Sequence, residues 1–312
     1  MYIGIDVGGT NLKAGLVNEA GELLRVSRMP LDFLNPQHFA KTLAALSQKL
    51  LKESGLTAAD IAYVGAGIPG AVQGGTVLYT ANIPMRDVPL ETLFRQHLDL
   101  PLLLANDADC AAAGEYLLGV GKGTKNFVIL TLGTGVGGGF ILNGKLYTGM
   151  GCAGEVGHMA IDLDGTPCNC GRKGCWEAVA SATGLIRLTK EAMGSHPDSL
   201  LHELAPTPEA VEGKTAFQAA QQGDETALGV CKRYCRYLGE GVTNLVNILN
   251  PEVVAIGGGV AAAPEKLLLN PVREFVAENC YSRHVGRFTR VERAVMGNDA
   301  GIIGAALIQR IL

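Results

Sequence analysis

One histidine and three cysteines lie close together in the sequence, at His158, Cys168, Cys170 and Cys175. Thiolates and imidazole are ligands that Zn²⁺ prefers, and four of them complete a tetrahedral structural site. Because a full set leaves no coordination position for water, the pattern predicts a zinc ion that holds the chain in place and takes no part in catalysis. The alternatives are a disulfide or unlinked thiols, and eight cysteines in 312 residues are too few for a disulfide scaffold. The other five cysteines are expected to be small core residues.

Two carboxylates flank this cluster, Glu155 just before His158 and Glu177 just after Cys175. A metal that fixes the loop would also fix both carboxylates. Carboxylates accept pairs of hydroxyl hydrogens well, so the arrangement predicts a wall that binds a polyol. The alternative is that the two glutamates only support the metal ligands.

A polar pair, Asn106-Asp107, stands between an apolar run and the start of an expected helix. Such a residue is by default a helix N-cap. The same position suits a catalytic base, because phosphoryl transfer to an alcohol needs a carboxylate that accepts the hydroxyl proton. The sequence leaves both interpretations open. Asp109 faces elsewhere on the helix and is the weaker candidate.

Glycine is over-represented, with 42 residues against an average usage of about 7%. The first glycine turn, Gly8 and Gly9 before Thr10, follows a strand, and backbone N–H groups in such a turn bind phosphate oxygens. Asp6 is placed to hold a hydrated Mg²⁺ beside the phosphates, and Thr10 and Lys13 could add donors. The alternative is a tight hairpin with a solvated aspartate.

Two further glycine turns follow apolar strands. Gly133, Thr134 and Gly135 form the first, and Gly257 and Gly258 belong to the second. Backbone without side chains at the second turn can lie against a nucleotide, although a simple strand-to-helix turn is equally consistent with it. Neither a P-loop pattern nor a dinucleotide-binding pattern is present in a suitable context.

The elements that must position these residues can be read from the apolar periodicity. Strands are predicted at residues 3–7, 12–17, 23–28, 61–68, 102–105, 127–132, 136–142, 146–147 and 253–256. Helices are predicted at residues 37–53, 107–118, 228–249 and 301–311. The apolar seam of residues 228–249 indicates a core or dimer-interface helix, with a coiled coil as the alternative. Residues 3–10 and 129–135 share one pattern of strand and glycine turn, which predicts a duplicated core.

Composition limits the class of protein. A chain of 312 residues exceeds a typical single core, so two domains or lobes are expected. Apolar residues make up 47% and charged residues 18%, with no run of membrane-spanning length and no signal-peptide pattern, so we expect a cytoplasmic protein without a membrane partner. The net charge of −4 and the lack of a basic patch argue against nucleic acid as a partner.

In order along the chain, these motifs resemble those of the ROK family of repressors, open reading frames and sugar kinases. They are Asp6-Val-Gly-Gly-Thr10, Asn106-Asp107, residues 132–139, Gly154-Glu155-Val-Gly-His158, residues 168–177 and residues 256–259. The resemblance spans nearly the whole chain, and the cysteine motif is its most specific part. Within the family, residues 168–175, 181–184 and 297–301 are most similar to the bacterial kinases of glucose. The family's repressors carry a DNA-binding segment ahead of the first strand, which here starts at residue 2, so a repressor is disfavoured.

The resemblance implies an α/β fold of the actin-like, ribonuclease H-like ATPase type, with a duplicated core and two lobes around a central cleft. The expected small lobe is residues 1–105 and 299–312, and the large lobe, residues 106–298, carries the zinc-binding loop and dimerisation helices. Asp107 is implied as the catalytic base. Implied sugar contacts are Asn82, Asn106, Asp107, Glu155, His158 and Glu177. Implied nucleotide and phosphate contacts are Gly8, Gly9, Thr10, Gly133, Thr134 and Gly258, and the histidine is implied to bind zinc through one ring nitrogen and to face the sugar with the other.

The expected reaction is ATP-dependent phosphorylation of a hexose at its 6-hydroxyl, with D-glucose as the first candidate substrate. The expected cofactors are ATP, Mg²⁺ and a structural Zn²⁺, and a homodimer or homotetramer is expected. Other hexose substrates left open are fructose, allose, N-acetylmannosamine and N-acetylglucosamine. A non-catalytic sugar sensor is less favoured because Asp107 is retained.

Overall fold

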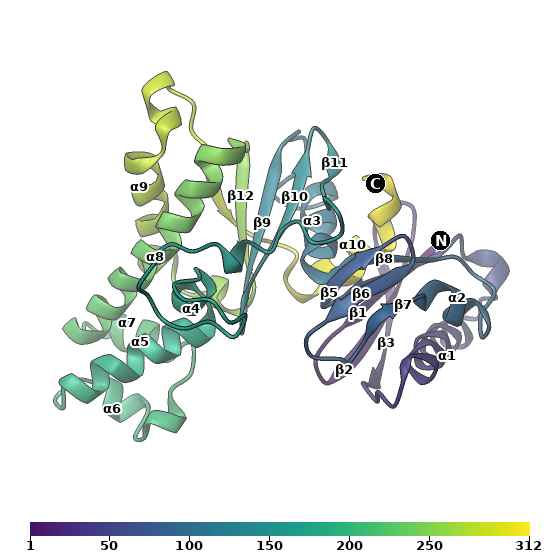
Figure 1. Ribbon diagram of the computed structural model, residues 1–312, viewed down its shortest axis with the longest axis horizontal. Helices are drawn as coiled ribbons and strands as arrows, with labels where there is room; N and C mark the ends of the chain where they lie inside the picture. The colour runs from purple at the N-terminus through teal and green to yellow at the C-terminus, as the bar shows by residue number, and fades with distance from the viewer. The chain divides into compact units, whose positions relative to one another are not determined.

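The computed structural model describes residues 1–312 and consists of two compact units (Figure 1). The first unit comprises Met1–Ile129, Gly139–Gly154 and Val295–Leu312, and the second comprises Leu130–Gly138 and Glu155–Ala294. These compact units are defined by how residues pack, whereas the expected lobes are parts of the protein that move relative to one another. The lobe boundaries expected after residues 105 and 298 therefore stay a prediction.

The first unit is built on a five-stranded mixed sheet with the order β3-β2-β1-β4-β8. Its strands are β1 (Tyr2–Val7), β2 (Asn11–Val17), β3 (Leu23–Pro30), β4 (Val64–Ile68) and β8 (Leu102–Asn106). The first three strands pair antiparallel, whereas β1, β4 and β8 run parallel. All five residues of β4 are buried, as expected for a parallel strand covered on both faces. A smaller sheet of β5 (Gly70–Gln73), β6 (Thr76–Thr80) and β7 (Arg86–Val88) was not predicted.

Helices cover this sheet. They are α1 (Pro36–Ser54), α2 (Leu90–Arg95), α3 (Asp107–Leu117) and α10 (Ala300–Leu307). Helix α1 begins after Asn35, whose side chain accepts a hydrogen bond from the backbone N–H of His38, and ends at Gly55 in the left-handed region. Helix α10 lies directly on β1 and β4, because a Cβ at Gly4 or Gly65 would come within 1.9 or 1.8 Å of its carbonyl oxygens. The end of the chain is thereby held against the centre of the first sheet.

A second five-stranded sheet repeats the arrangement of the first, with the order β11-β10-β9-β12-β13. Its strands are β9 (Phe127–Leu132), β10 (Val136–Leu142), β11 (Lys145–Leu146), β12 (Val253–Gly257) and β13 (Arg290–Arg293), and β9 and β10 contribute residues to both units. In each sheet the strand before the glycine turn is central, the next two strands lie on one side, and two later strands lie on the other. The predicted duplication is therefore confirmed. Between β10 and β11, Asn143 and Gly144 both have positive φ, as a type I′ hairpin turn requires.

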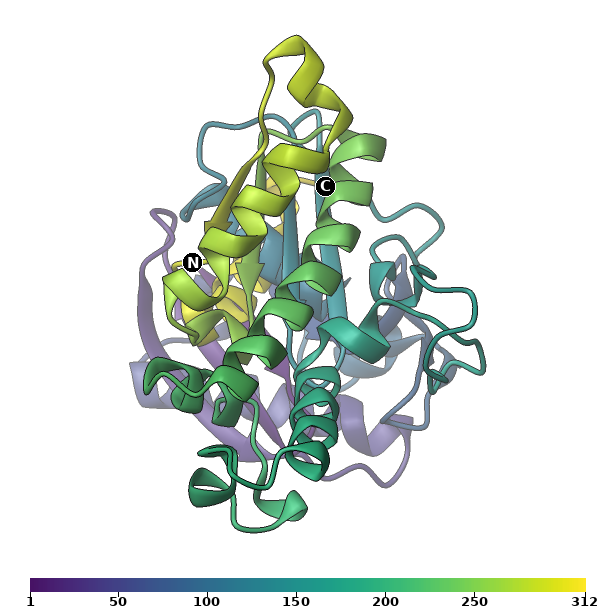
Figure 2. The same ribbon diagram turned by 90° about the vertical axis from the view of Figure 1, so that its left-hand side faces the viewer.

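The second unit is mainly helical (Figure 2). Its helices are α4 (Glu177–Ala180), α5 (Ala182–Ser195), α6 (Leu201–Leu204), α7 (Thr215–Gln221), α8 (Glu225–Leu249) and α9 (Leu269–Asn279). The seam of α8 is buried at Cys231, Cys235, Leu238 and Val242 and packs against other helices of the same chain, which confirms a core helix. That seam is not available to a second chain. None of the helices is both long and apolar enough to cross a membrane.

Of the five cysteines predicted to be small core residues, four are buried, namely Cys110, Cys231, Cys235 and Cys280. Cys152 is exposed, so the prediction was wrong there. It lies in the turn-rich segment after β11, where no regular element packs over it.

Candidate active site and metal centre

The carboxyl edge of β1, β4 and β8 brings the acidic candidates of the first unit together. Asp6 near the end of β1 pairs with Gly67 of β4, and Ile68 pairs with Asn106 at the end of β8. Ends of parallel strands meet at one edge of a sheet, which is where α/β proteins bind ligands. Cys110 lies among these groups, and burial, together with the charges of nearby carboxylates, raises the pKa of its thiol.

Asn106 and Asp107 have separate roles at the start of α3. The side chain of Asn106 is the N-cap, because its Oδ1 accepts from the backbone N–H of Ala108 at 2.8 Å while its Nδ2 donates to the Gly70 carbonyl at 3.1 Å. Asp107 is the first helical residue, and its Oδ1 accepts from the same N–H at 3.0 Å. Asp107 is exposed, whereas Asp109 is buried, so a substrate can reach only the first of the two.

The first glycine turn joins β1 to β2 and lies beside Asp6. The N–H of Gly8 donates to the Asn11 carbonyl at 3.0 Å, which closes the turn and leaves Gly9 and Thr10 exposed. The carboxylate of Asp6 is 3.7 Å from Lys13 Nζ, and its side chain is 27% exposed. Burial raises the pKa of Asp6, and the Lys13 charge opposes this shift. Asp6 and the exposed hydroxyl of Thr10 are oxygen donors of the kind that Mg²⁺ takes.

Asn82 lies exposed in the segment between β6 and β7, and no hydrogen bond ties it to the other predicted residues of the first unit.

The second glycine turn, between β9 and β10, is held by the corner where α4 meets α5. The N–H of Gly133 donates to the Gly135 carbonyl at 3.0 Å. The N–H of Ala182 donates to the Gly133 carbonyl at 2.8 Å, and the Thr183 hydroxyl donates to the Thr134 carbonyl at 2.9 Å. Sequence reasoning gave Thr183 no role, although it lies in the motif at residues 181–184. That motif begins at Ser181, the N-cap of α5, and this helix start was the signal for a residue that holds a neighbouring loop.

The third glycine turn lies against the second. Gly258 follows β12 with φ of +82°, and a Cβ there would come within 2.4 Å of the Leu132 carbonyl oxygen. Leu132 directly precedes Gly133, so the structure brings the two turns together. A short 3₁₀ helix (Gly259–Ala262) follows Gly258, so the turn also has the form of the simpler strand-to-helix alternative.

The four predicted metal ligands are gathered at one point of the second unit. The ligand atoms of His158, Cys168, Cys170 and Cys175 all lie within 4.8 Å of one another. Cys170 Sγ is 3.6 Å from Cys175 Sγ, and Cys168 Sγ is 3.7 Å from His158 Nδ1. Tetrahedral zinc with bonds of about 2.0–2.3 Å places its ligand atoms roughly 3.5–3.8 Å apart, so the donor set and these two pair distances fit zinc.

The cysteine thiols differ in how readily they ionise. Burial raises the pKa of Cys175 to about 12, whereas a backbone hydrogen bond from Arg172 lowers the pKa of Cys170. A divalent cation at the cluster would displace the remaining protons, because thiolate is the form that binds metal.

The imidazole of His158 has one nitrogen on each side. Nδ1 faces the cysteines, and Nε2 lies 3.9 Å from Glu155 Oε2 on the accessible side of the ring. The side chain of Glu155 is 55% exposed. The structure therefore allows the two tasks that the resemblance implied for the histidine.

Glu177 connects the metal cluster to the second glycine turn. Its Oε2 accepts from the N–H of Val136 at 2.9 Å, and its Oε1 is 4.0 Å from Cys168 Sγ. A Cβ at Gly135 would come within 2.2 Å of the same carboxylate. The sequence left two roles open for Glu177, sugar binding and support of neighbouring groups. The structure shows the supporting role, in which one carboxylate oxygen accepts the hydrogen bond from Val136.

Comparisons with known proteins point to one family over nearly the whole chain. The family model described as the ROK family matches residues 2–310. The chain is 38% identical over 308 residues to a glucokinase of Halalkalibacterium halodurans, covering 97% of this chain and 93% of that protein. It is 38% identical over 310 residues to a glucokinase of Thermotoga maritima, covering 98% and 96%. A solved ROK family glucokinase of Streptomyces griseus, in complex with glucose and AMPPNP, matches with a TM-score of 0.82 at 34% identity, covering 98% of this chain and 97% of that chain.

The solved relatives also settle the fold. Together with the repeated order of the two sheets, they confirm the predicted α/β fold of the actin-like type with a duplicated core.

Proposed function

Because the chain belongs to the ROK family, we propose that it is a glucokinase, which transfers the γ-phosphate of ATP to the 6-hydroxyl of D-glucose. The observation that carries this proposal is the position of Asp107, an exposed carboxylate at a helix start on the strand edge that also bears the first glycine turn. The relatives named glucokinase match almost the full chain, and this supports glucose as the substrate.

In this mechanism Asp107 accepts the proton of the 6-hydroxyl as the oxygen attacks the γ-phosphate. The backbone N–H of Ala108 holds one oxygen of this carboxylate and Asn106 caps the helix, so the base is oriented before the sugar arrives. Positioning and charge neutralisation are the main contributions a protein makes to phosphoryl transfer. We assign binding of the sugar hydroxyls to the remaining predicted contacts, which are Asn82, Asn106, Glu155, His158 and Glu177.

The glycine turns are assigned to ATP. Backbone N–H groups at Gly9 and Thr10, and at Thr134 and Gly135, would receive phosphate oxygens, while the N–H groups of Gly8 and Gly133 close the two turns. Gly257 and Gly258 would lie along the nucleoside, and a side chain at Gly258 would clash with the backbone of Leu132. Asp6 would hold Mg²⁺ with its water ligands, Lys13 would lie beside it, and the ion supplies neutralisation of the phosphate charge when bound.

Zinc is assigned to His158, Cys168, Cys170 and Cys175. Four protein ligands leave no position for a substrate, so the ion supplies geometry and no chemical step. What the loop presents is the outward nitrogen of His158 next to Glu155. We place the protein in the cytoplasm, where ATP is present and thiols stay reduced, and all eight cysteines are free.

An ADP-release assay over a panel of sugars tests the proposal. Glucose is expected to give the highest kcat/KM among glucose, mannose, fructose, allose, N-acetylglucosamine and N-acetylmannosamine. A clear preference for one of the other sugars would move the proposal to a different hexose kinase. If none of these sugars caused ADP release, the kinase assignment would be overturned.

A further inference from the structure

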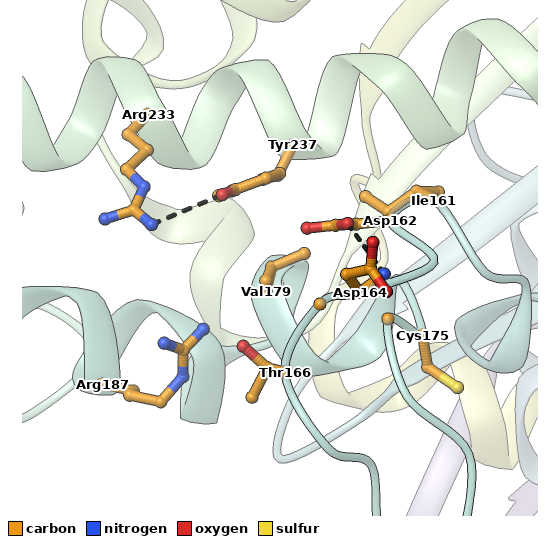
Figure 3. Close-up of a pocket in the computed structure, with 11 residues that line it drawn as sticks. Ile161, Asp162, Asp164, Thr166, Cys175, Val179, Arg187, Arg233 and Tyr237 are labelled. Carbon is orange, nitrogen blue, oxygen red and sulfur yellow. Dashed lines mark hydrogen bonds between the residues drawn. The ribbon is translucent and has the colours of Figure 1, made fainter.

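A cavity of about 330 Å³ opens in the second unit between residues 161–175 and the helices α4, α5 and α8 (Figure 3). Its polar side chains are Asp162, Asp164, Thr166, Arg187, Arg233 and Tyr237. None of these six residues belongs to the site proposed above. They combine two guanidinium groups, two hydroxyl groups and two carboxylates, a set that needs its own explanation.

One side of the cavity is rich in hydrogen-bond donors. Arg187 on α5 and Arg233 on α8 share a single carboxylate, that of Glu191, so the pair retains positive charge. Arg233 Nη2 donates to the Tyr237 hydroxyl at 3.4 Å, and Arg187 Nη2 donates to the Ala178 carbonyl at 3.3 Å. Each guanidinium has five N–H donors, so these contacts orient the two groups and leave donors for a ligand. In Figure 3 the Arg187 guanidinium and the Thr166 hydroxyl face the same space.

The other side of the cavity is rich in acceptors. Asp162 and Asp164 lie there, and the N–H of Asp164 donates to Asp162 Oδ1 at 3.3 Å, which fixes the first carboxylate (Figure 3). Guanidinium groups match a phosphate, whereas carboxylates accept hydrogens from hydroxyl groups. A ligand that satisfies both sides therefore carries a phosphate at one end and hydroxyl groups at the other.

We propose that this cavity binds a phosphorylated sugar, with its phosphate on Arg187 and Arg233 and its hydroxyl groups on Asp162 and Asp164. The identity of the ligand rests on the proposed function, because hexose 6-phosphate is the product of that reaction. The cavity wall belongs to the loop that carries the metal ligands. The N–H of Ile161 donates to the Gly174 carbonyl and that of Gly174 to the Thr166 carbonyl, each at 2.9 Å, and Cys175 follows directly. A bound product would thus act on the loop that positions His158 and change the affinity for sugar.

Calorimetric titration of the full-length protein with glucose 6-phosphate tests this assignment. The protein is kept saturated with glucose, so that the product cannot enter the sugar site. We expect one binding event that Arg233→Gln weakens roughly tenfold to hundredfold, because a hydrogen bond to a charged group is worth about 1.5–3 kcal/mol. Arg236→Gln is the matched control, since Arg236 is exposed on the same helix but does not line the cavity, and it should bind like the native protein.

A second pair of titrations tests the acceptor side. Asp162→Asn keeps the oxygen that Asp164 contacts but loses the charge, so it should weaken glucose 6-phosphate and bind inorganic phosphate at least as well as the native protein does. Equal affinity of the native protein for phosphate and sugar phosphate would overturn the sugar part of the proposal. No binding at millimolar concentration, or equal binding by the native protein and Arg233→Gln, would overturn the site. If no sugar is phosphorylated but the Arg233-dependent binding is found, the site stands and the proposed function fails.

Discussion

At the scale of single residues, the proposed reaction depends most on Asp107. Asp107→Ala removes the proton acceptor, so we expect kcat to fall by about a hundredfold or more while the affinity for glucose stays within a few-fold of native. Asn106 remains as the N-cap, so α3 should still form. Steady-state kinetics give kcat, and calorimetry gives the affinity. A variant that keeps more than about a tenth of the native kcat would show that another group is the base.

Asp6 links stability to pH in a direction that can be worked out. Burial raises its pKa, so the folded chain binds the proton more tightly than the unfolded chain. The free energy of unfolding therefore falls as pH rises through the range between the two pKa values. Asp6→Asn removes the buried charge, so the variant without ligand should be more stable than the native protein at pH about 7, with the gain lost as the native carboxyl protonates below about pH 4. Its affinity for MgATP should fall roughly tenfold or more.

Urea unfolding at both pH values checks this prediction, with Asp224→Asn as a control of opposite sign. Asp224 is also partly desolvated, but hydrogen bonds from Ala227 and Leu200 give it a lowered pKa. Its charge should therefore add stability at neutral pH. If Asp6→Asn were less stable than native at neutral pH, the pairing with Lys13 at 3.7 Å would outweigh the burial of the carboxylate.

At the scale of elements, the loop of residues 158–175 has little regular structure and depends on its ligands. It contains only isolated bridges, Ala160 with Cys175 and Pro167 with Lys173. Removing zinc with a strong chelator should therefore lower the thermal midpoint and raise the KM for glucose, because His158 and Glu155 lose their fixed positions. Metal content is measured in parallel by emission spectroscopy. Metal-free protein with native kinetics would contradict a structural role for the ion.

Helix α8 packs against Trp176, the residue that directly follows this loop. Gly241 lies against the ring of Trp176, and an added Cβ would come within 2.0 Å of ring carbons. The indole N–H of Trp176 donates to the Tyr237 carbonyl at 2.8 Å, so the ring cannot easily move away. Alanine normally stabilises a helix interior by about 1 kcal/mol over glycine. Here the clash with the Trp176 ring should outweigh this gain, so Gly241→Ala should lower the free energy of unfolding by about 1–3 kcal/mol.

A matched control for this substitution lies on the same helix. Nothing lies within 4 Å of a Cβ placed on Gly229, so Gly229→Ala should raise the free energy of unfolding by up to about 1 kcal/mol. Trp176 is the only tryptophan, so its fluorescence follows the packed ring directly during urea unfolding. Equal effects of the two substitutions would show that the ring yields to the new methyl group.

The sequence predicted the long elements better than the contacts between them. The stripe of α1 and the seam of α8 repeat over several turns, so local periodicity sufficed. Strand β13, Arg290–Arg293, carries mostly charged residues and forms because it pairs with β12, a relation that no local pattern contains. The same holds for the hydrogen bond from Val136 to Glu177, which joins residues far apart in the sequence. Tertiary contacts of this kind decide which predicted residues support one another.

At the scale of the whole molecule, an exposed apolar patch is a candidate interface for the expected homodimer or homotetramer. The patch consists of Ile248, Tyr281, Val285 and Phe288, which are 70%, 75%, 68% and 60% exposed. Tyr281 and Val285 lie on one 3₁₀ helix (Tyr281–Val285), and the N–H of Tyr281 donates to the side chain of Asn247 at 2.8 Å, next to Ile248 at the end of α8. Phe288 follows this helix by three residues. Large apolar side chains gathered on a surface indicate an interface, and a two-fold axis would bury two such patches at once.

Sedimentation velocity tests this assignment. We expect the native protein to sediment as a dimer or larger species, and Phe288→Asp to shift it toward the monomer, because a charge would have to be buried in the contact. Leu34→Asp is the control, since Leu34 is also 70% exposed but lies in the first unit, so its association should stay native. The seam of α8 cannot substitute for the patch, because its residues are already buried within the chain. A native monomer, or unchanged association of Phe288→Asp, would rule out this patch as the interface.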